Sequence, residues 1–261
     1  MQLSLSGKNA LVGGASAGIG RAVAIELAAL GAQVTLLART ESSLQEAVAA
    51  LDASQGQRHG YIAADFSDSK MLLEKVAGLL SQQPVHILVN NTGGPPGGPI
   101  TEASVESFLA AYHNHLICNQ LLAQSVLPGM KAAGFGRIIN IISTSVKEPL
   151  DNLGVSNSTR WAVAGWAKTW ANEVGRFGIT VNNVLPGYTR TGRLTEIIEK
   201  RAAAGGMTSE AVEEQFKSHV PVRRFADPSE IAAAAAFLAS PAAGYVNGIN
   251  LPVDGGRTRS L

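Results

Sequence analysis

Residues 13–20, "GGASAGIG", decide the fold. The segment 8–12, "KNALV", precedes them and is typical of a short buried strand, and a helical apolar pattern at 21–30, closed by Gly31, follows. The segment therefore predicts a strand, a glycine turn and a helix. Glycines let the backbone approach an anion closely, while free amide groups and the helix dipole face it. Directly after a first strand, such a turn indicates a dinucleotide-binding site.

The same alternation of strand and helix continues along the chain. We expect further strands at 33–37, 60–64, 85–90, 137–142, 180–185 and 248–253, and helices at 41–51, 69–80, 105–131, 156–176 and 229–239. The stretch 192–224 is the most polar and least regular, so we expect an insertion over one end of the sheet, helical in part at 210–218. Alternation without a linker predicts one α/β domain over residues 1–261, with a doubly wound parallel sheet of about seven strands and helices on both faces.

The composition excludes several classes of function. Twenty-one Lys and Arg against 20 Asp and Glu leave a formal net charge of +1, which provides no field for nucleic acid or an anionic membrane. The single Cys118 can form neither an intramolecular disulfide nor a thiolate metal cluster, which favours a reducing compartment. The chain shows no secretory signal, and no apolar run has the roughly 20 residues of a membrane helix. We expect a cytoplasmic protein without metal, nucleic-acid or membrane binding.

The end of the second strand distinguishes the two nicotinamide cofactors. An acidic side chain there binds the adenosine 2′-hydroxyl, whereas an arginine pairs with a 2′-phosphate. The sequence has the neutral Ala38 followed by Arg39 and Thr40. This favours NADP(H) over NAD(H). If Arg39 is an ordinary surface arginine, the choice of cofactor stays open.

Further motifs follow the predicted strands in order: Asp65, "NNTG" at 90–93, Ser143 and "PGYTRT" at 186–191. With the glycine turn and the tail "YVNGINLPVDGG", they cover nearly the whole chain. In these motifs the sequence resembles the short-chain dehydrogenase/reductase family. In "NNTGGPP" and "VNNVLPG" it is similar to a divergent branch often labelled 3-oxoacyl-acyl-carrier-protein reductase-like. The resemblance implies a Rossmann fold and an NADP(H)-linked oxidoreductase.

The resemblance also implies which residues hold the cofactor. Asp65 and Phe66 would flank the adenine, the segment 91–93 would line the adenosine-ribose side, and the loop after the sixth strand would hold the nicotinamide carboxamide or the pyrophosphate. All of these follow the carboxyl ends of strands, where open α/β sheets bind ligands. The predicted cofactor set is Gly14, Ser16, Gly18, Ile19, Gly20, Arg39, Thr40, Asp65, Phe66, Asn91, Thr92, Gly93, Arg160, Pro186, Gly187, Thr189 and Thr191.

The catalytic positions depart from the family pattern. Family members usually carry an Asn on the fourth helix, a Ser after the fifth strand and a Tyr-x-x-x-Lys pair on the next helix. The Tyr donates a proton to the alkoxide, and the Lys lowers the pKa of the phenol. Ser143 matches the Ser, but the other three positions hold His115, Ser156 and Arg160. Arg160 can hold charge and bind the ribose but cannot relay a proton, and a serine is a far weaker acid than a phenol.

Three groups could replace the missing phenol: His115, Tyr188 or a water bound by Ser156. An unperturbed histidine titrates near pH 6.5 and is the most natural substitute. However, His115 could be a polar residue in a helix-packing surface, and Tyr188 an aromatic that lines the pocket.

Two functions therefore stay open. The first is an NADP(H)-dependent enzyme that reduces a carbonyl, including a 3-oxoacyl thioester, or oxidises a secondary alcohol. The second is a nucleotide-binding homologue that has lost catalysis and serves as a sensor or oligomer partner.

Two further sets of residues bear on partners. Three tryptophans lie on the helix expected at 156–176 and indicate packing or an interface: Trp161, Trp166 and Trp170. By the resemblance, this helix and the fourth pair across a subunit interface, which implies a homotetramer, with a dimer as the alternative. Four arginines bracket the insertion and could face an acidic substrate, although solvated surface arginines are the simpler interpretation: Arg190, Arg193, Arg223 and Arg224.

Overall fold

The structure, a computed structural model, describes residues 1–260. Its centre is one parallel sheet of seven strands in the order β3-β2-β1-β4-β5-β6-β7. The strands are β1 (Asn9–Gly13), β2 (Gln33–Ala38), β3 (Gly60–Ala63), β4 (Ile87–Asn90), β5 (Gly136–Ile141), β6 (Ile179–Pro186) and β7 (Asn250–Val253). The strand order reverses between β1 and β4, so the predicted doubly wound α/β sheet is confirmed.

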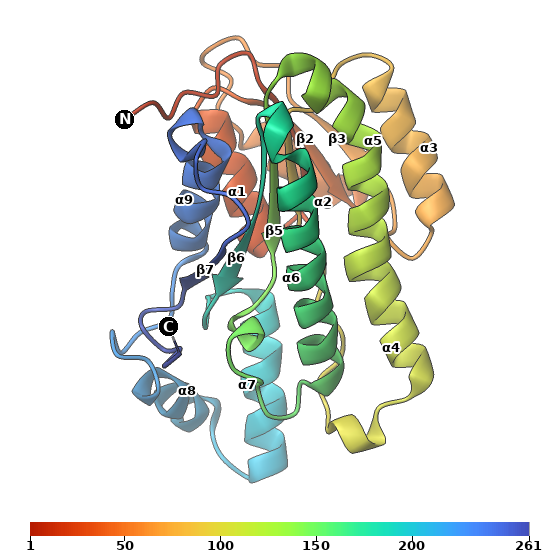
Figure 1. Cartoon of the computed structure of the whole chain (residues 1–261). Helices are drawn as coiled ribbons and strands as arrows, with labels where there is room; N and C mark the ends of the chain where they lie inside the picture. Colours follow the sequence, from red (N-terminus) through yellow and green to blue (C-terminus); the bar gives the residue numbers. More distant parts are fainter. Residues whose placement is uncertain (261) are drawn as a thin grey trace.

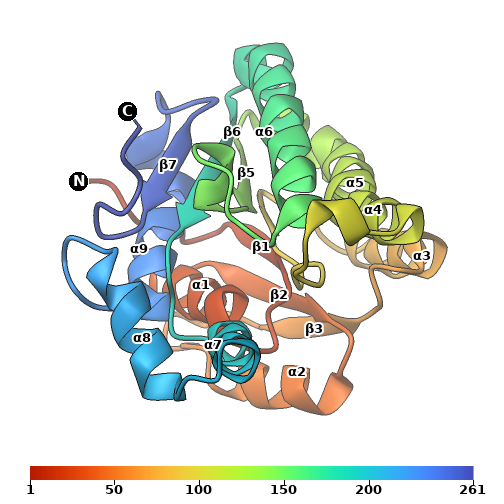
Figure 2. The same ribbon diagram turned by 90° about the horizontal axis from the view of Figure 1, so that it is seen from below.

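Helices cover both faces of this sheet (Figures 1 and 2). One face carries α1 (Gly18–Ala29), α2 (Glu41–Ala49) and α9 (Pro228–Ala239), and the other carries α3 (Ser69–Leu80), α5 (Cys118–Ala133) and α6 (Gly154–Val174). Alternate strand residues enter the two cores, since Val12 packs on the first face and Leu11 on the second. Among residues 1–260, none of the helices has the length and apolar content that a membrane crossing needs.

The long helix expected at 105–131 follows one axis but has three parts. α4 (Val105–Tyr112) runs into a π-helical turn at His113–Ile117, and α5 continues to Ala133. A π turn adds one residue to a helical turn, and such turns occur frequently at functional sites. His115 lies within this turn.

The region 192–224 is more regular than its polarity suggested. It contains α7 (Gly192–Gly205), which we did not expect, and α8 (Ser209–Ser218). Each begins at a threonine, Thr191 or Thr208, whose hydroxyl accepts a backbone N–H of the first turn. The two helices bury an apolar cluster of their own and form a cap at the carboxyl edge of the sheet (Figure 1).

A row of asparagines crosses four strands below that edge. Nδ2 of Asn90 donates to Oδ1 of Asn140 at 2.8 Å, Asn140 donates in the same way to Asn183 at 2.8 Å, and Asn183 to Asn250 at 2.7 Å. These residues are neighbours in the strand register, so all the amides point the same way. The row links β4 to β7 through side chains as well as backbone.

Candidate active site

The glycine turn between β1 and α1 is packed too tightly for side chains. Gly14 has a φ of 58°, and a Cβ there would lie 2.6 Å from Nδ2 of Asn91. A Cβ at Gly20 would lie 2.3 Å from the carbonyl oxygen of Gly14. Nδ2 of Asn91 donates to the carbonyl oxygen of Gly13 at 3.1 Å. Asn91, directly after β4, therefore stabilises the glycine turn that follows β1.

The start of α1 carries no side-chain cap. Its N-cap residue is Ala17, and the first turn has no acidic residue. The first amide groups of α1, together with the helix dipole, are therefore free to bind an anion. Thr191 borders this region, because its Cγ2 would lie 3.3 Å from a Cβ built at Gly18. Other predicted cofactor residues lie half-buried at the same edge: Ser16, Ile19, Thr92 and Pro186.

The ends of β2 and β3 form the predicted adenosine side. Arg39 and Thr40 are exposed where β2 ends. The carboxylate of Asp65 accepts the backbone N–H of Ser67 at 2.9 Å. That hydrogen bond, with a smaller effect from the charge of Arg39, holds the pKa of Asp65 below its ordinary value. An arginine and an ionised aspartate therefore lie near each other at this end of the site.

Phe66 points into the core. Its ring belongs to the apolar cluster under α3 and α5, and its Cζ would lie 3.3 Å from a Cβ built at Gly13. Its carbonyl oxygen accepts the Sγ–H of Cys118 at 3.1 Å. The expectation that Phe66 flanks the adenine can therefore apply to its backbone only.

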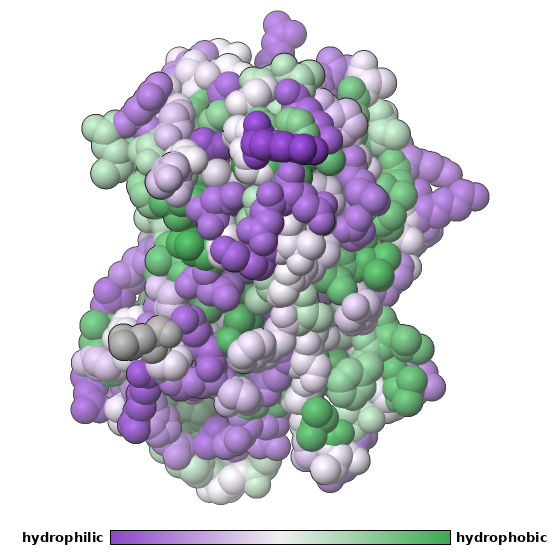
Figure 3. All heavy atoms as spheres, viewed as in Figure 1, coloured by the Kyte–Doolittle hydropathy of each residue, from purple (hydrophilic) through white to green (hydrophobic). Residues whose placement is uncertain are grey.

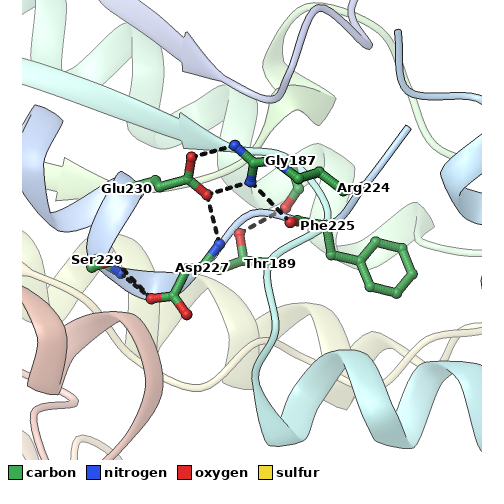
Figure 4. A network of polar contacts seen from close by, with 7 residues as sticks. All are labelled: Gly187, Thr189, Arg224, Phe225, Asp227, Ser229 and Glu230. Atoms are coloured by element: carbon green, nitrogen blue, oxygen red, sulfur yellow. Dashed lines mark hydrogen bonds and ion pairs between the residues drawn. The ribbon is translucent and has the colours of Figure 1, made fainter. Parts of the chain in front are cut away.

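Backbone hydrogen bonds tie the loop after β6 to the segment that leads into α9: the N–H of Arg190 donates to the carbonyl oxygen of Ala226, and the N–H of Ala226 to that of Tyr188, both at 2.9 Å. Side chains add hydrogen bonds within each of the two segments (Figure 4). Oγ1 of Thr189 donates to the carbonyl oxygen of Gly187 at 3.1 Å. Arg224 pairs with Glu230 at 2.6 Å, and Glu230 accepts the backbone N–H of Asp227 at 2.8 Å. These two partners hold the pKa of Glu230 at about 2. The loop is therefore fixed next to the start of α9, with the Thr189 hydroxyl engaged inside it.

Arg160 lies buried beside the carboxyl end of β5. Its Nη1 donates to the carbonyl oxygen of Ile141 at 3.2 Å, whereas its buried Nε has no hydrogen-bond partner among residues 1–260. Burial lowers the pKa of the guanidinium to about 10, so the group stays charged at neutral pH. Nη2 would lie 4.0 Å from a Cβ at Gly94, in the loop after β4. A buried donor without a partner is suited to an oxygen atom of a ligand.

His115 reaches the same place but is neutral at ordinary pH. It is 2% exposed, and burial, followed by the positive charge of Arg160, lowers its pKa to about 2. A hydrogen bond to the backbone of Gly93 opposes this shift without cancelling it. The value near 6.5 belongs to an unperturbed ring, and burial beside Arg160 holds the pKa of His115 well below it.

The two serines of the site lie at different elements. Ser143 is half-buried after β5, and its Oγ accepts the backbone N–H of Ser145 at 3.0 Å, which leaves its own O–H free to donate. Ser156 is half-buried in the first turn of α6, four residues before Arg160 and on the same helical face.

The ring of Tyr188 is packed between an aromatic side chain and a guanidinium group. This ring stacks on Phe216 with centroids 4.7 Å apart and planes at 7°. The guanidinium of Arg257 lies 4.6 Å from the centre of the Tyr188 ring. Sequence reasoning missed Arg257, although a signal existed, because the residue follows β7 at the same carboxyl edge as the other site residues.

These features define a class: a Rossmann-type α/β protein with an anion-binding glycine turn and a polar site at the carboxyl ends of β4, β5 and β6. The comparisons then identify the family. A family model described as enoyl-(acyl carrier protein) reductase matches residues 14–258. Together with the relatives below, this match shows that the chain belongs to the short-chain dehydrogenase/reductase family.

Relatives match along nearly the whole chain. A 3-oxoacyl-acyl-carrier-protein reductase of Pseudomonas aeruginosa is 34% identical, with 97% of this chain and 98% of that protein covered. The gluconate 5-dehydrogenase of Gluconobacter oxydans is 33% identical, with 99% and 97% covered. The crystal structure of L-sorbose reductase from Gluconobacter frateurii, complexed with NADPH and L-sorbose, matches with a TM-score of 0.93 at 32% identity and 100% coverage of both chains.

Proposed function

We propose that this protein is an NADP(H)-dependent oxidoreductase that reduces a carbonyl group or oxidises a secondary alcohol. One observation carries the proposal: two features lie at the same edge of the sheet. They are a glycine turn that is open to an anion and the buried, charged Arg160, whose Nε lacks a partner within residues 1–260. Relatives that match the whole chain support it, including a reductase complexed with NADPH.

The residues fit a nicotinamide dinucleotide. The space that a Cβ at Gly14 or Gly20 would fill lets the backbone approach a pyrophosphate, and the uncapped amides of α1 would bind its oxygens. Arg39 would pair with an adenosine 2′-phosphate. Nε of Arg160 would donate to a hydroxyl of the nicotinamide ribose. When bound, the nicotinamide supplies or accepts the hydride.

The remaining chemistry falls to side chains around Arg160. The O–H of Ser143 would hold the substrate oxygen, and the guanidinium charge would favour the developing alkoxide. His115 is neutral at pH 7 and bonds to the backbone of Gly93, so we assign it to positioning that loop. Tyr188 is packed between an aromatic ring and a guanidinium. We therefore propose that the proton comes from a water bound by Ser156.

Steady-state assays with NADPH test this proposal on ketones, 3-oxoacyl thioesters and, in the reverse direction, alcohols. We expect slow turnover that falls at least about tenfold in Ser143→Ala, because the variant loses the hydrogen bond to the substrate oxygen. Ser158→Ala is the matched control, since its exposed hydroxyl donates to the Gly154 carbonyl on the outer face of α6. Tight NADPH binding without any turnover would contradict the catalytic role.

The alternative is a nucleotide-binding protein that has lost catalysis and acts as a sensor or oligomer partner. The neutral state of His115 favours it, because an imidazole with a pKa of about 2 holds no extra proton to donate at pH 7. The double substitution Ser156→Tyr with Arg160→Lys distinguishes the two functions. Activity that arises from a silent wild type supports the alternative, whereas measurable wild-type turnover excludes it.

We also propose a cytoplasmic homotetramer, with a dimer as the alternative assembly. A groove of about 810 Å³ lies between α5 and α6, where Trp166 and Trp170 both donate to Oε1 of Gln120, at 2.7 and 2.9 Å. Exposed apolar side chains gather over α4 (Figure 3, lower right): Ile100, Val105, Leu109 and Tyr112. Apolar surface of this kind suits contact with a second chain. Light scattering that reports only a monomer would contradict the proposal.

A further inference from the structure

We propose that Arg257 selects an anionic substrate, a carbonyl compound whose carboxylate binds the guanidinium while its carbonyl faces Ser143. The inference rests on the proposed oxidoreductase function and names its class of substrate. The inference is based on the position of Arg257, which lies in the segment after β7 and beside the candidate site.

Hydrogen bonds hold that segment in place. The carboxylate of Asp254 accepts the backbone N–H of Thr258 at 2.8 Å. Glu148, in the loop after β5, accepts the backbone N–H of Arg259 at 2.8 Å. Arg257 directly precedes these two anchored amides, and its own N–H donates to the carbonyl oxygen of Asp254 at 3.3 Å, so its side chain starts from a fixed backbone.

The guanidinium of Arg257 contacts two loops of the site. Its Nη1 donates to Oγ1 of Thr144 at 3.4 Å, and Thr144 directly follows Ser143 in the sequence. Its Cζ lies 4.6 Å from the ring centre of Tyr188, in the loop after β6. The cation therefore lies between the loop that carries the catalytic serine and the loop next to the predicted nicotinamide site.

This cation has no anionic partner within residues 1–260. The ion pairs there join Arg193 to Glu196, Lys217 to Glu213 and Glu214, and Arg224 to Glu230. A guanidinium has five N–H groups, and the hydrogen bond to Thr144 uses one of those of Arg257. An arginine stacked on an aromatic ring keeps its in-plane N–H edge free, and that edge matches the two oxygens of a carboxylate.

Three of the four arginines that bracket α7 and α8 are already engaged, and the fourth, Arg190, is exposed and close enough to Asp227 for its charge to lower the pKa of that carboxyl. Arg193 donates to the carbonyl oxygen of Pro95 at 2.8 Å and pairs with Glu196. Arg223 donates to a backbone carbonyl in α8, and Arg224 belongs to the ion pair with Glu230 (Figure 4). The acidic substrate considered for the bracketing arginines is therefore better matched by Arg257.

Matched pairs of ketones test the inference. In the first pair, 5-keto-D-gluconate carries a carboxylate where L-sorbose carries a hydroxymethyl group. In the second pair, acetoacetate carries a carboxylate where methyl acetoacetate carries a neutral methyl ester. Binding of each is measured by titration calorimetry with and without NADPH, and kcat/KM by NADPH oxidation. We expect the acid of a pair to bind about tenfold or more tightly, because the hydrogen bonds to the carboxylate are charge-assisted.

Variants then locate the source of the preference. Arg257→Gln should remove the advantage of the acid and change binding of the neutral partner less than about twofold, whereas Arg257→Lys should keep part of it, since an ammonium retains charge without the planar fork. Arg259→Gln is the matched control, because its exposed side chain belongs to the same segment.

The possible failures are distinguishable. Equal binding of acid and neutral partners by the wild type, or an equal loss of both in Arg257→Gln, would overturn the inference. Absence of NADPH binding, measured separately by nucleotide fluorescence, would overturn the oxidoreductase function. An Arg257-dependent preference for acids without nucleotide would still support the anion site.

Discussion

The nucleotide end and the catalytic end of this site are built in opposite ways. Around the glycine turn, backbone meets backbone so closely that a Cβ at Gly20 would lie 2.3 Å from the oxygen of Gly14. Around Arg160, polar side chains keep unused hydrogen-bonding capacity, and the buried Nε of Arg160 and Oγ of Ser145 lack partners within residues 1–260. The first end depends on the absence of side chains, and the second on which side chains are present. Chemistry can therefore change at the catalytic end while the fold and the nucleotide turn stay the same.

The largest expected effect is at the glycine turn. In Gly20→Ala, the new Cβ would overlap the Gly14 carbonyl and lie 2.7 Å from Nδ2 of Asn91, so the turn must open. We expect NADPH affinity, measured by nucleotide fluorescence, to fall at least about 1,000-fold, or roughly 4 kcal/mol. Gly78→Ala is the matched control, because Gly78 is also helical and a Cβ there meets nothing within 4 Å. Equal affinity in both variants would mean that close backbone packing does not shape the nucleotide end.

The next effect concerns the polar support of the catalytic end. Asn140 is fully buried and lies in the middle of the asparagine row. In Asn140→Ala, Nδ2 of Asn90 and Oδ1 of Asn183 lose their partners, so we expect the free energy of unfolding in urea to fall by about 3 kcal/mol. Asn250→Ala, at the half-buried end of the row, breaks one bond and should cost about 1 kcal/mol. Equal losses at the two positions would show that the row does not act through burial.

Much of the fold could be predicted because its signals are local. The helix at 69–80 was predicted with the bounds that α3 has, since its apolar spacing is regular and Asp68 caps its start. α1 begins at Gly18, three residues earlier than expected, because the glycine turn runs directly into a helix without a side-chain cap. The π turn at His113–Ile117 could not be predicted, because it does not change the spacing of apolar residues along the sequence.

The site was predictable only in part because side-chain direction depends on distant contacts. The glycine turn and Ser143 follow strands, so topology alone brings them to one edge. The direction of Phe66 is set by the core under α5, and that of Tyr188 by Phe216 and Arg257, which lie far away in the sequence. No pattern within a short window contains such information.

The third test uses pH at the catalytic end. The pKa of His115 is about 2 in the folded chain, against about 6.5 for an unperturbed histidine. Between these values the unfolded chain binds the extra proton, so the free energy of unfolding falls by about 1.4 kcal/mol per pH unit as the pH drops below about 6.5. From pH 7 to pH 5, His115 should remove about 2 kcal/mol, and His115→Asn should lack this loss. Parallel pH profiles of the two proteins would contradict a buried, neutral imidazole.

The smallest expected effect lies at the exposed margin of the nucleotide end. Arg39 is solvent-exposed at the end of β2, where a 2′-phosphate would remain in contact with water. Arg39→Gln should weaken NADPH binding about tenfold, or about 1.4 kcal/mol, and change NADH binding less than about twofold, because only NADPH carries the phosphate. Arg58→Gln, which also removes an exposed arginine, is the matched control and should leave both affinities unchanged. If Arg39→Gln weakens both nucleotides equally, Arg39 is an ordinary surface arginine and the choice of cofactor is made by other groups. A selective loss would show that even at this end, where backbone packing shapes the turn, the identity of the nucleotide is decided by a single charged side chain.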